Sequence, residues 1–77
     1  MEKPNVKFTS IEDAGFGGCI YGVVESHPQL GENRSIRTST VLKISIDDLT
    51  IETRNSIYTV PEEYREKLIT IKSYLNV

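Results

Sequence analysis

The sequence predicts an α+β domain: a small curved antiparallel sheet or partial barrel of three to five strands, followed by one C-terminal helix. Two observations carry this prediction. Apolar and polar side chains alternate with a period of two between residues 35 and 59, as in strands. After Pro61, apolar residues recur at helical spacing. The 77 residues leave room for one small core, so 1–77 is expected to be a single domain.

The N-terminal residues, 1–14, mix charged and polar residues with isolated Val6, Phe8 and Ile11. This pattern fits either a short edge strand or a partly ordered arm. The stretch "GFGG" at 15–18 predicts a flexible break in the chain. It has neither the Lys-Ser/Thr ending of a P-loop nor the glycine spacing of a dinucleotide fingerprint, so a turn is favoured over a phosphate loop.

The next segment, "CIYGVVES", is rich in β-forming residues and predicts a strand at about 20–26. His27 and Pro28 should end this strand, because proline lacks a backbone donor and favours extended geometry in the residue before it. The stretch "PQLGEN" is then expected to be a loop.

Two further strands are predicted on either side of Asp47 and Asp48. From 35 to 46 the even positions form the more apolar face, and from 49 to 59 the odd positions do. The two faces meet if Asp47 and Asp48 form a two-residue loop. A loop at 48–49 would also join them, but it sets like charges opposite each other, Lys43 against Arg54. The favoured register pairs Ile44 with Ile51, Lys43 with Glu52, Ser39 with Ser56, and Arg37 with Tyr58.

A helix is predicted at about 61–74, since Pro61 suits its first turn and acidic residues follow directly. It should pack on the sheet or pair with another chain through one apolar stripe. The stripe consists of Tyr64, Leu68, Ile71 and Leu75, widened by Ile69.

Composition narrows the class of partner. The formal charge of −2 gives no overall positive field, so duplex DNA is not expected. Cys19 is the single cysteine, which leaves no intrachain disulfide and no Cys/His zinc site, and suits a reducing cytosol. No apolar run resembles a signal peptide or a membrane span. We expect a cytoplasmic protein with no membrane contact. Because its core is small, we also expect a homo-oligomer.

A polar phrase recurs on the two predicted strands, "RTS" at 37–39 and "TRNS" at 53–56. Arginine offers a planar fork of donors to phosphate or carboxylate, and hydroxyls and amides add neutral donors. Alternatively, these are ordinary strand residues, and the arginines only solvate the exposed face, with Arg37 stacked on Tyr58. The predicted ligand-binding residues are Arg37, Thr38, Ser39, Arg54, Asn55, Ser56 and Tyr58.

No catalytic, metal or cofactor site is predicted. His27 is the sole histidine, and although Cys19 or Ser26 could act as a nucleophile beside it, Glu25 is the only acidic residue nearby in sequence to orient it. Turn preference alone explains the paired aspartates at 47–48. An enzyme is therefore not expected.

The phrase "HPQLGENRSIRTSTVLKI", with "ETRNSIY" after it, resembles small β proteins that phages and prophages encode. Some of these bind host factors or sequester nucleotide signals used in defence. The resemblance covers about residues 20–60 and implies a non-enzymatic viral protein that acts in the host cytoplasm. It assigns no binding residue.

The favoured function is capture, without chemistry, of an anionic small molecule that bears phosphate, such as a nucleotide signal. The alternative is a protein-interaction module that inhibits or regulates a host protein through its polar sheet face or edge.

Overall fold

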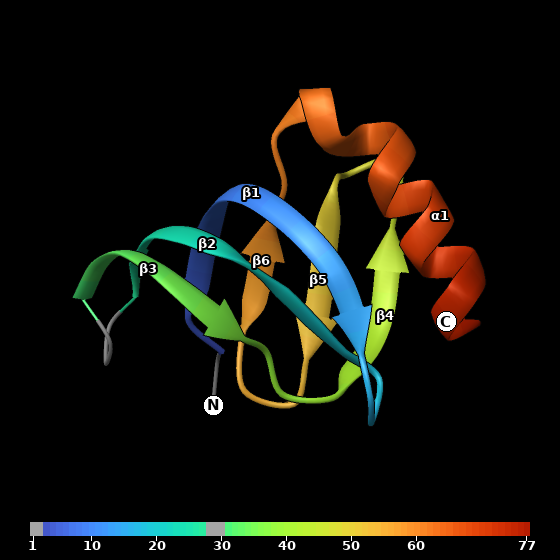
Figure 1. Cartoon of the computed structure of the whole chain (residues 1–77), viewed down its shortest axis with the longest axis horizontal. Coiled ribbons are helices and arrows are strands. Elements are labelled where there is room, and N and C mark those ends of the chain that lie inside the picture. The colour runs from blue at the N-terminus through green and yellow to red at the C-terminus, as the bar shows by residue number, and fades with distance from the viewer. Residues whose placement is uncertain (1–2, 28–30) are drawn as a thin grey trace.

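The fold is α+β, with six strands in one sheet and a C-terminal helix (Figure 1). A computed structural model of the chain describes residues 3–27 and 31–77. The elements are β1 (Asn5–Gly15), β2 (Cys19–His27), β3 (Gly31–Arg37), β4 (Val41–Ser45), β5 (Thr50–Thr53), β6 (Ile57–Thr59), the 3₁₀ turn η1 (Glu62–Tyr64) and α1 (Arg65–Leu75). The prediction of an α+β domain with a C-terminal helix is confirmed.

The sheet differs from the prediction in strand number and in direction. Its order is β3-β2-β1-β6-β5-β4, and it is open, with β3 and β4 at the edges. The β1–β6 pair is parallel while the other pairs are antiparallel, so the sheet is mixed. The strands number six because each of the two long alternating segments is broken in the middle and the N-terminal segment adds β1.

The long strand β1 belongs to both halves of the sheet. Its beginning pairs with β6, at Asn5 to Lys7, and from Phe8 onward it pairs with β2. Figure 1 shows β1, β2 and β3 curving across the β4–β6 half, and the apolar side chains of the two halves form the core between them. The N-terminal segment is therefore a central strand, and the prediction of an edge strand or arm was wrong.

The break between β3 and β4 falls at residues 38–40, where the chain crosses the start of β2. The Thr38 amide donates to Ile20 O (2.9 Å), and the Ile20 amide donates to Thr38 Oγ1 (3.0 Å). The Val41 amide donates to Gly18 O (2.9 Å). After the crossing, Val41 is buried and Leu42 is 50% exposed, the reverse of the predicted alternation. A register shift between Val41 and Lys43 then restores the predicted alternation, so Ile44 is buried.

The break between β5 and β6 is a turn organised by Thr53. The Thr53 hydroxyl donates to Ser56 O (3.1 Å) and accepts from the Ser56 amide (3.1 Å) and the Asn55 amide (3.3 Å). Side-chain hydrogen bonds of this kind favour a turn over a continuing strand. The chain reverses here, so β6 pairs with β5, and Ser56 and Tyr58 become buried although the alternation placed them on the polar face.

The predicted register holds close to the Asp47-Asp48 turn, where Ile44 lies opposite Ile51 and Lys43 opposite Glu52. Beyond the two breaks it fails. The pairs predicted between Arg37 and Tyr58 and between Ser39 and Ser56 do not form. Instead Arg37 lies opposite Tyr21 on β2, and Tyr58 lies opposite Val6 and Ile51.

The predicted strand at about 20–26 is confirmed as β2, and "GFGG" forms the β1–β2 turn. In the predicted "PQLGEN" loop, residues 28–30 lie outside the described residues, and 31–33 belong to β3.

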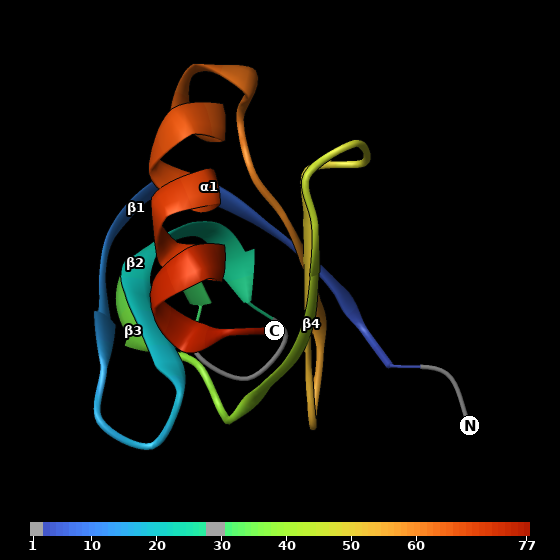
Figure 2. The same cartoon turned by 90° about the vertical axis from the view of Figure 1, so that its right-hand side faces the viewer.

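The C-terminal helix covers the side of the molecule where the two halves diverge (Figure 2). Leu68 is fully buried and Ile71 is 4% exposed, while Tyr64 and Leu75 pack against the core. Ile69 is 47% exposed and does not widen this apolar contact, contrary to the prediction. Within the described residues, no helix has the length and apolar character required to cross a membrane.

Candidate functional site

A polar hollow of about 610 Å³ lies where three connections meet: the β1–β2 turn, the β3–β4 crossing and the β5–β6 turn. These connections lie together at the bottom of Figure 1, at the end of the sheet away from η1. The hollow is lined by Gly17, Cys19, Arg37, Thr38, Ser39, Thr40, Arg54 and Asn55. Its described lining residues include two arginines and no carboxylate.

Five of the predicted ligand-binding residues line the polar hollow: Arg37, Thr38, Ser39, Arg54 and Asn55. The predicted hairpin is not what brings these residues together. The two polar phrases are themselves the places where the strands break, and the Arg54 amide donates to Thr40 O (3.2 Å), which joins the two connections.

Ser56 and Tyr58 lie in the core instead. Each is 3% exposed, and the Tyr58 ring stacks on Phe8 with centroids 4.8 Å apart and an interplanar angle of 24°. Burial raises the pKa of the Tyr58 hydroxyl, an effect that a hydrogen bond with Ser56 partly opposes. The alternative in which Arg37 stacks on Tyr58 is also excluded, because Phe8 occupies that position.

Arg37 is held at the end of β3 by two contacts. Its Nε donates to Cys19 Sγ (3.1 Å), and Nη2 donates to Phe16 O (3.4 Å). The hydrogen bond to Cys19, followed by the charges of Cys19 and Tyr21, raises the pKa of the guanidinium. Arginine has five N–H donors in a fixed plane, so most of them stay available to a ligand. Arg37 is therefore a fixed cation with free donors.

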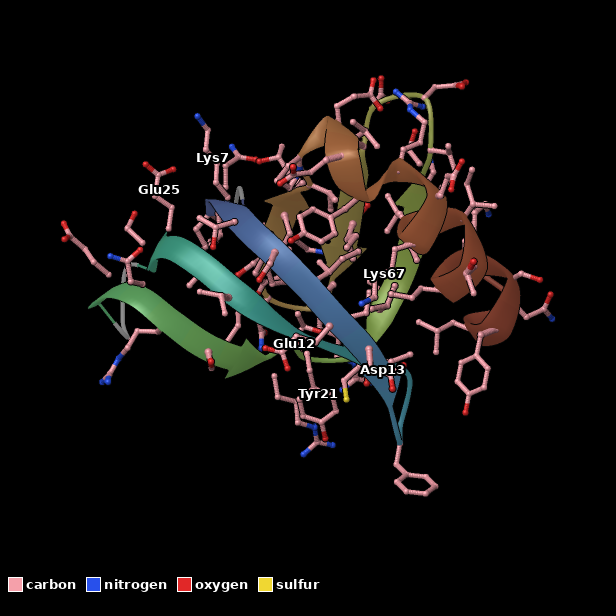
Figure 3. The ribbon with its side chains drawn as sticks, turned by 45° about the horizontal axis from the view of Figure 1, so that its top comes forward. Lys7, Glu12, Asp13, Tyr21, Glu25 and Lys67 are labelled. Atoms are coloured by element: carbon pink, nitrogen blue, oxygen red, sulfur yellow. The ribbon has the colours of Figure 1, made fainter. Side chains whose placement is uncertain are left out.

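Arg54 is exposed in the β5–β6 turn. Its guanidinium makes no hydrogen bond or ion pair with the part of the chain that the structure describes. Figure 3 shows Glu12 and Asp13 extending from β1, and Glu52 pairs with Lys3 (2.8 Å). Glu12 lines a neighbouring hollow together with Arg37, outside the polar hollow itself. Among its described lining residues, the polar hollow thus carries two positive charges and no carboxylate, although the whole chain is acidic.

The hydroxyls of the β3–β4 crossing differ in their partners. Thr38 Oγ1 donates to Ser39 O (2.8 Å) and accepts from Ile20, so it is satisfied. Ser39 Oγ is buried and has no hydrogen-bond partner among residues 3–27 and 31–77. A buried hydroxyl without a partner costs about 1–3 kcal/mol, and most native structures avoid it. Ser39 also lines the polar hollow, so its hydroxyl is a candidate donor to a ligand there.

Sequence reasoning missed Gly17, Cys19 and Thr40 as lining residues. Thr40 directly follows the first polar phrase and could have been included with it. Gly17 and Cys19 flank the end of "GFGG", but their proximity to residues 37–40 depends on the β2–β3 pairing. Gly17 and Gly18 have φ values of 81° and 75°, which only glycine adopts without strain, so the turn requires them.

Cys19 and Asp48, two other described residues with reactive or metal-binding side chains singled out from the sequence, have structural roles. Cys19 is buried, and its thiol donates to Phe16 O (3.3 Å). Asp48 belongs to the β4–β5 turn, where Ser45 Oγ donates to its carboxylate (3.2 Å). Within the described ranges, no three His, Cys, Asp or Glu side chains are placed to hold a metal ion.

Comparison of the chain with protein-family models, with curated proteins and with solved structures gives no match, so the polar hollow is interpreted from its own geometry.

Proposed function

We propose that the protein captures a phosphate-bearing small molecule, a nucleotide in its favoured form, and does so without chemistry. One observation carries the proposal. Arg37, at the end of β3, and Arg54, in the β5–β6 turn, line the same hollow, whose described lining residues include no carboxylate. Charged hydrogen bonds from arginine to phosphate are among the strongest in proteins. Two guanidinium groups with hydroxyl and amide neighbours form a suitable site for a doubly charged anion.

A binding role is favoured over an enzymatic one by the same residues. The hollow combines cations with hydroxyl and amide donors, and its thiol, that of Cys19, is buried and accepts a hydrogen bond from Arg37. Among the described lining residues, no general base lies beside it. In the setting that the resemblance to phage proteins suggests, the captured molecule would be a nucleotide signal of the host. To sequester a signal, a protein must bind it tightly and be present in at least as many copies as the signal. A small binding protein can meet both requirements.

The test is a thermal-shift panel of orthophosphate, pyrophosphate, ribose 5-phosphate, and nucleoside mono-, di- and cyclic phosphates. A ligand that binds only the folded chain stabilises it by about 2.7 kcal/mol at a hundred times its Kd. We expect the melting temperature to rise with at least one phosphate compound, and the rise to vanish in a double variant with Arg37→Ala and Arg54→Ala. A flat panel at millimolar concentrations would contradict the proposal.

A second candidate is a protein-interaction module that inhibits or regulates a host protein, and the edge strand β3 favours it. β3 ends the sheet, pairs only with β2 in the strand order, and exposes five consecutive residues, 31–35. An open edge can accept an extended segment of a partner by β-strand addition. Arg34 and Arg37 on this strand suit an acidic partner. A flat phosphate panel, together with loss of partner binding on Ser35→Pro, would favour this candidate.

Self-association is part of the proposal as well. Two apolar side chains of α1 are exposed at separate positions on the helix, Ile69 at 47% and Tyr74 at 75%. Exposed apolar side chains of this kind suit a two-fold contact between copies. Sedimentation at tens of micromolar should show a dimer. A monomer there would contradict the dimer and leave the polar hollow as a site within one chain.

A further inference from the structure

Phe16 is the most exposed large apolar side chain among the described residues, at 95%. It stands at the tip of the β1–β2 turn, directly before Gly17, which lines the polar hollow. The ring does not pack in the core. The proposed phosphate site does not explain the "GFGG" motif to which Phe16 belongs. Leaving such a side chain in water forgoes about 1.5–3 kcal/mol of burial free energy.

The turn holds Phe16 at the rim of the polar hollow through its backbone. Phe16 O accepts hydrogen bonds from Arg37 Nη2 (3.4 Å) and from Cys19 Sγ (3.3 Å). The carbonyl is thus attached to a cation of the hollow, while the ring extends away from the core. Gly17 and Gly18, both with positive φ, follow the ring and leave its side of the turn without other side chains.

The other aromatic residues are engaged elsewhere or lie elsewhere. Phe8 and Tyr58 stack on each other in the core. Tyr21, on β2 (Figure 3), lies opposite Arg37, but it is 40% exposed and its ring packs close to Gly15. Tyr74, on α1, lines a different hollow together with Asp13 and Thr70. Phe16 is therefore the most exposed aromatic ring near the polar hollow, and its own carbonyl accepts from Arg37.

We infer that Phe16 is the base-stacking residue of the site, and that the ligand is a nucleotide, with its phosphate on Arg37 and Arg54. This inference rests on the proposed function. The volume of about 610 Å³ falls within the roughly 300–1,000 Å³ range of small-molecule sites, far more than one phosphate group occupies. Stacking on an exposed ring tolerates any base, because every base has a flat π face.

The first test compares two probes that differ only in the base, adenosine 5′-monophosphate and ribose 5-phosphate. Stacking of one base on an aromatic side chain contributes about 1–3 kcal/mol, or about 5- to 150-fold in Kd. Phe16→Ala should weaken adenosine monophosphate binding by that factor and change ribose 5-phosphate binding less than twofold. Phe16→Tyr should restore the affinity, and Tyr74→Ala, at an exposed aromatic residue outside the hollow, should change neither.

The second test uses fluorescence, because the chain has no tryptophan. Phe16→Trp introduces a single reporter at the proposed stacking position, excited at a wavelength that the nucleotide does not absorb. Adenosine monophosphate should quench its emission, and ribose 5-phosphate should not. In the matched control, Tyr74→Trp, neither probe should change the emission.

The outcomes separate the two proposals. If both probes bind equally and Phe16→Ala changes neither, the stacking role is wrong while phosphate capture stands. If Phe16→Ala weakens both probes to the same extent, Phe16 acts through the turn and the stacking role is again wrong. If neither probe nor any other phosphate compound binds the wild-type chain, the proposed function itself fails.

Discussion

The helix-covered side of the molecule and the polar hollow differ in how completely their side chains are packed and hydrogen-bonded. On the helix side, Leu68 and Ile71 are buried against the sheet, and Arg65 Nη1 donates to Ile46 O (2.9 Å). At the hollow, a guanidinium and a buried hydroxyl have no partner in the described chain, and a phenylalanine is in water. The first region stabilises the fold, whereas the second leaves polar groups unpaired, as the proposed phosphate site requires.

The largest effect should follow from breaking the helix side. Leu68→Ala should lower the free energy of unfolding by about 2–5 kcal/mol, because it removes a fully buried side chain and leaves a cavity. Chemical denaturation measures this loss. Leu42→Ala, on β4, is the matched control: it makes the same substitution at a side chain that is 50% exposed, so it should change stability by no more than about 0.5 kcal/mol. Equal effects at both positions would contradict the packing described for α1.

At the polar hollow, we expect variants to lose ligand binding and to keep their stability. Arg37→Ala and Arg54→Ala should each weaken phosphate binding by about 1.5–3 kcal/mol, the range for charged hydrogen bonds, with little change in stability. Titration calorimetry with the tightest compound of the panel measures this loss. Lys43→Ala, on the exposed face of β4, is the control for general charge. A loss with Lys43→Ala as large as that with Arg54→Ala would mean that no specific clamp exists.

A smaller effect, on both stability and phosphate binding, is expected at Ser39. Ser39→Ala should leave the free energy of unfolding unchanged, or raise it by up to about 1 kcal/mol, because the variant no longer buries a hydroxyl without a partner. Binding of the same phosphate compound should weaken. Thermal unfolding with and without this compound measures both quantities. A clear loss of stability without ligand would show that the hydroxyl supports the fold and not the site.

The smallest effect concerns the ion pair between Lys3 and Glu52, outside both regions. The hydrogen bond from Lys3, then its charge, lowers the pKa of Glu52 below its ordinary 4.5. A carboxyl with a lowered pKa in the folded state stabilises the fold above its unfolded pKa and loses this contribution as the pH falls through the folded pKa. Glu52→Gln should therefore melt slightly below wild type at pH 7, and the two curves should converge in acid. A difference that is independent of pH would contradict this.

Sequence reasoning succeeded where local periodicity decides structure. The Asp47-Asp48 turn, the register beside it and the helix stripe all follow from neighbours in the chain. β1 escaped recognition because of its irregular pairing with β2, which shifts between Phe8 and Ser10 and again between Ile11 and Asp13. The shifts place Val6, Phe8 and Ile11 on the core side although their spacing is not a period of two.

The candidate site was anticipated in its residues more than in its geometry. Arginine, serine, threonine and asparagine in two phrases correctly indicated where polar groups gather. What they could not indicate was that these phrases interrupt the strands, since this depends on Thr38 bonding to Ile20 and on the turn around Thr53. Hydrogen bonds between distant segments decided which residues reached the hollow and which entered the core.

The shared strand β1 also sets an order of folding events. β1–β3 and β4–β6 each pair strands that follow one another in sequence, so each can form by closing short loops. The β1–β6 pair joins the two ends of the chain and requires the closure of a long loop. We therefore expect the two meanders to form first and to dock last through β1. Val6→Ala should then accelerate unfolding and leave the folding rate nearly unchanged in stopped-flow kinetics.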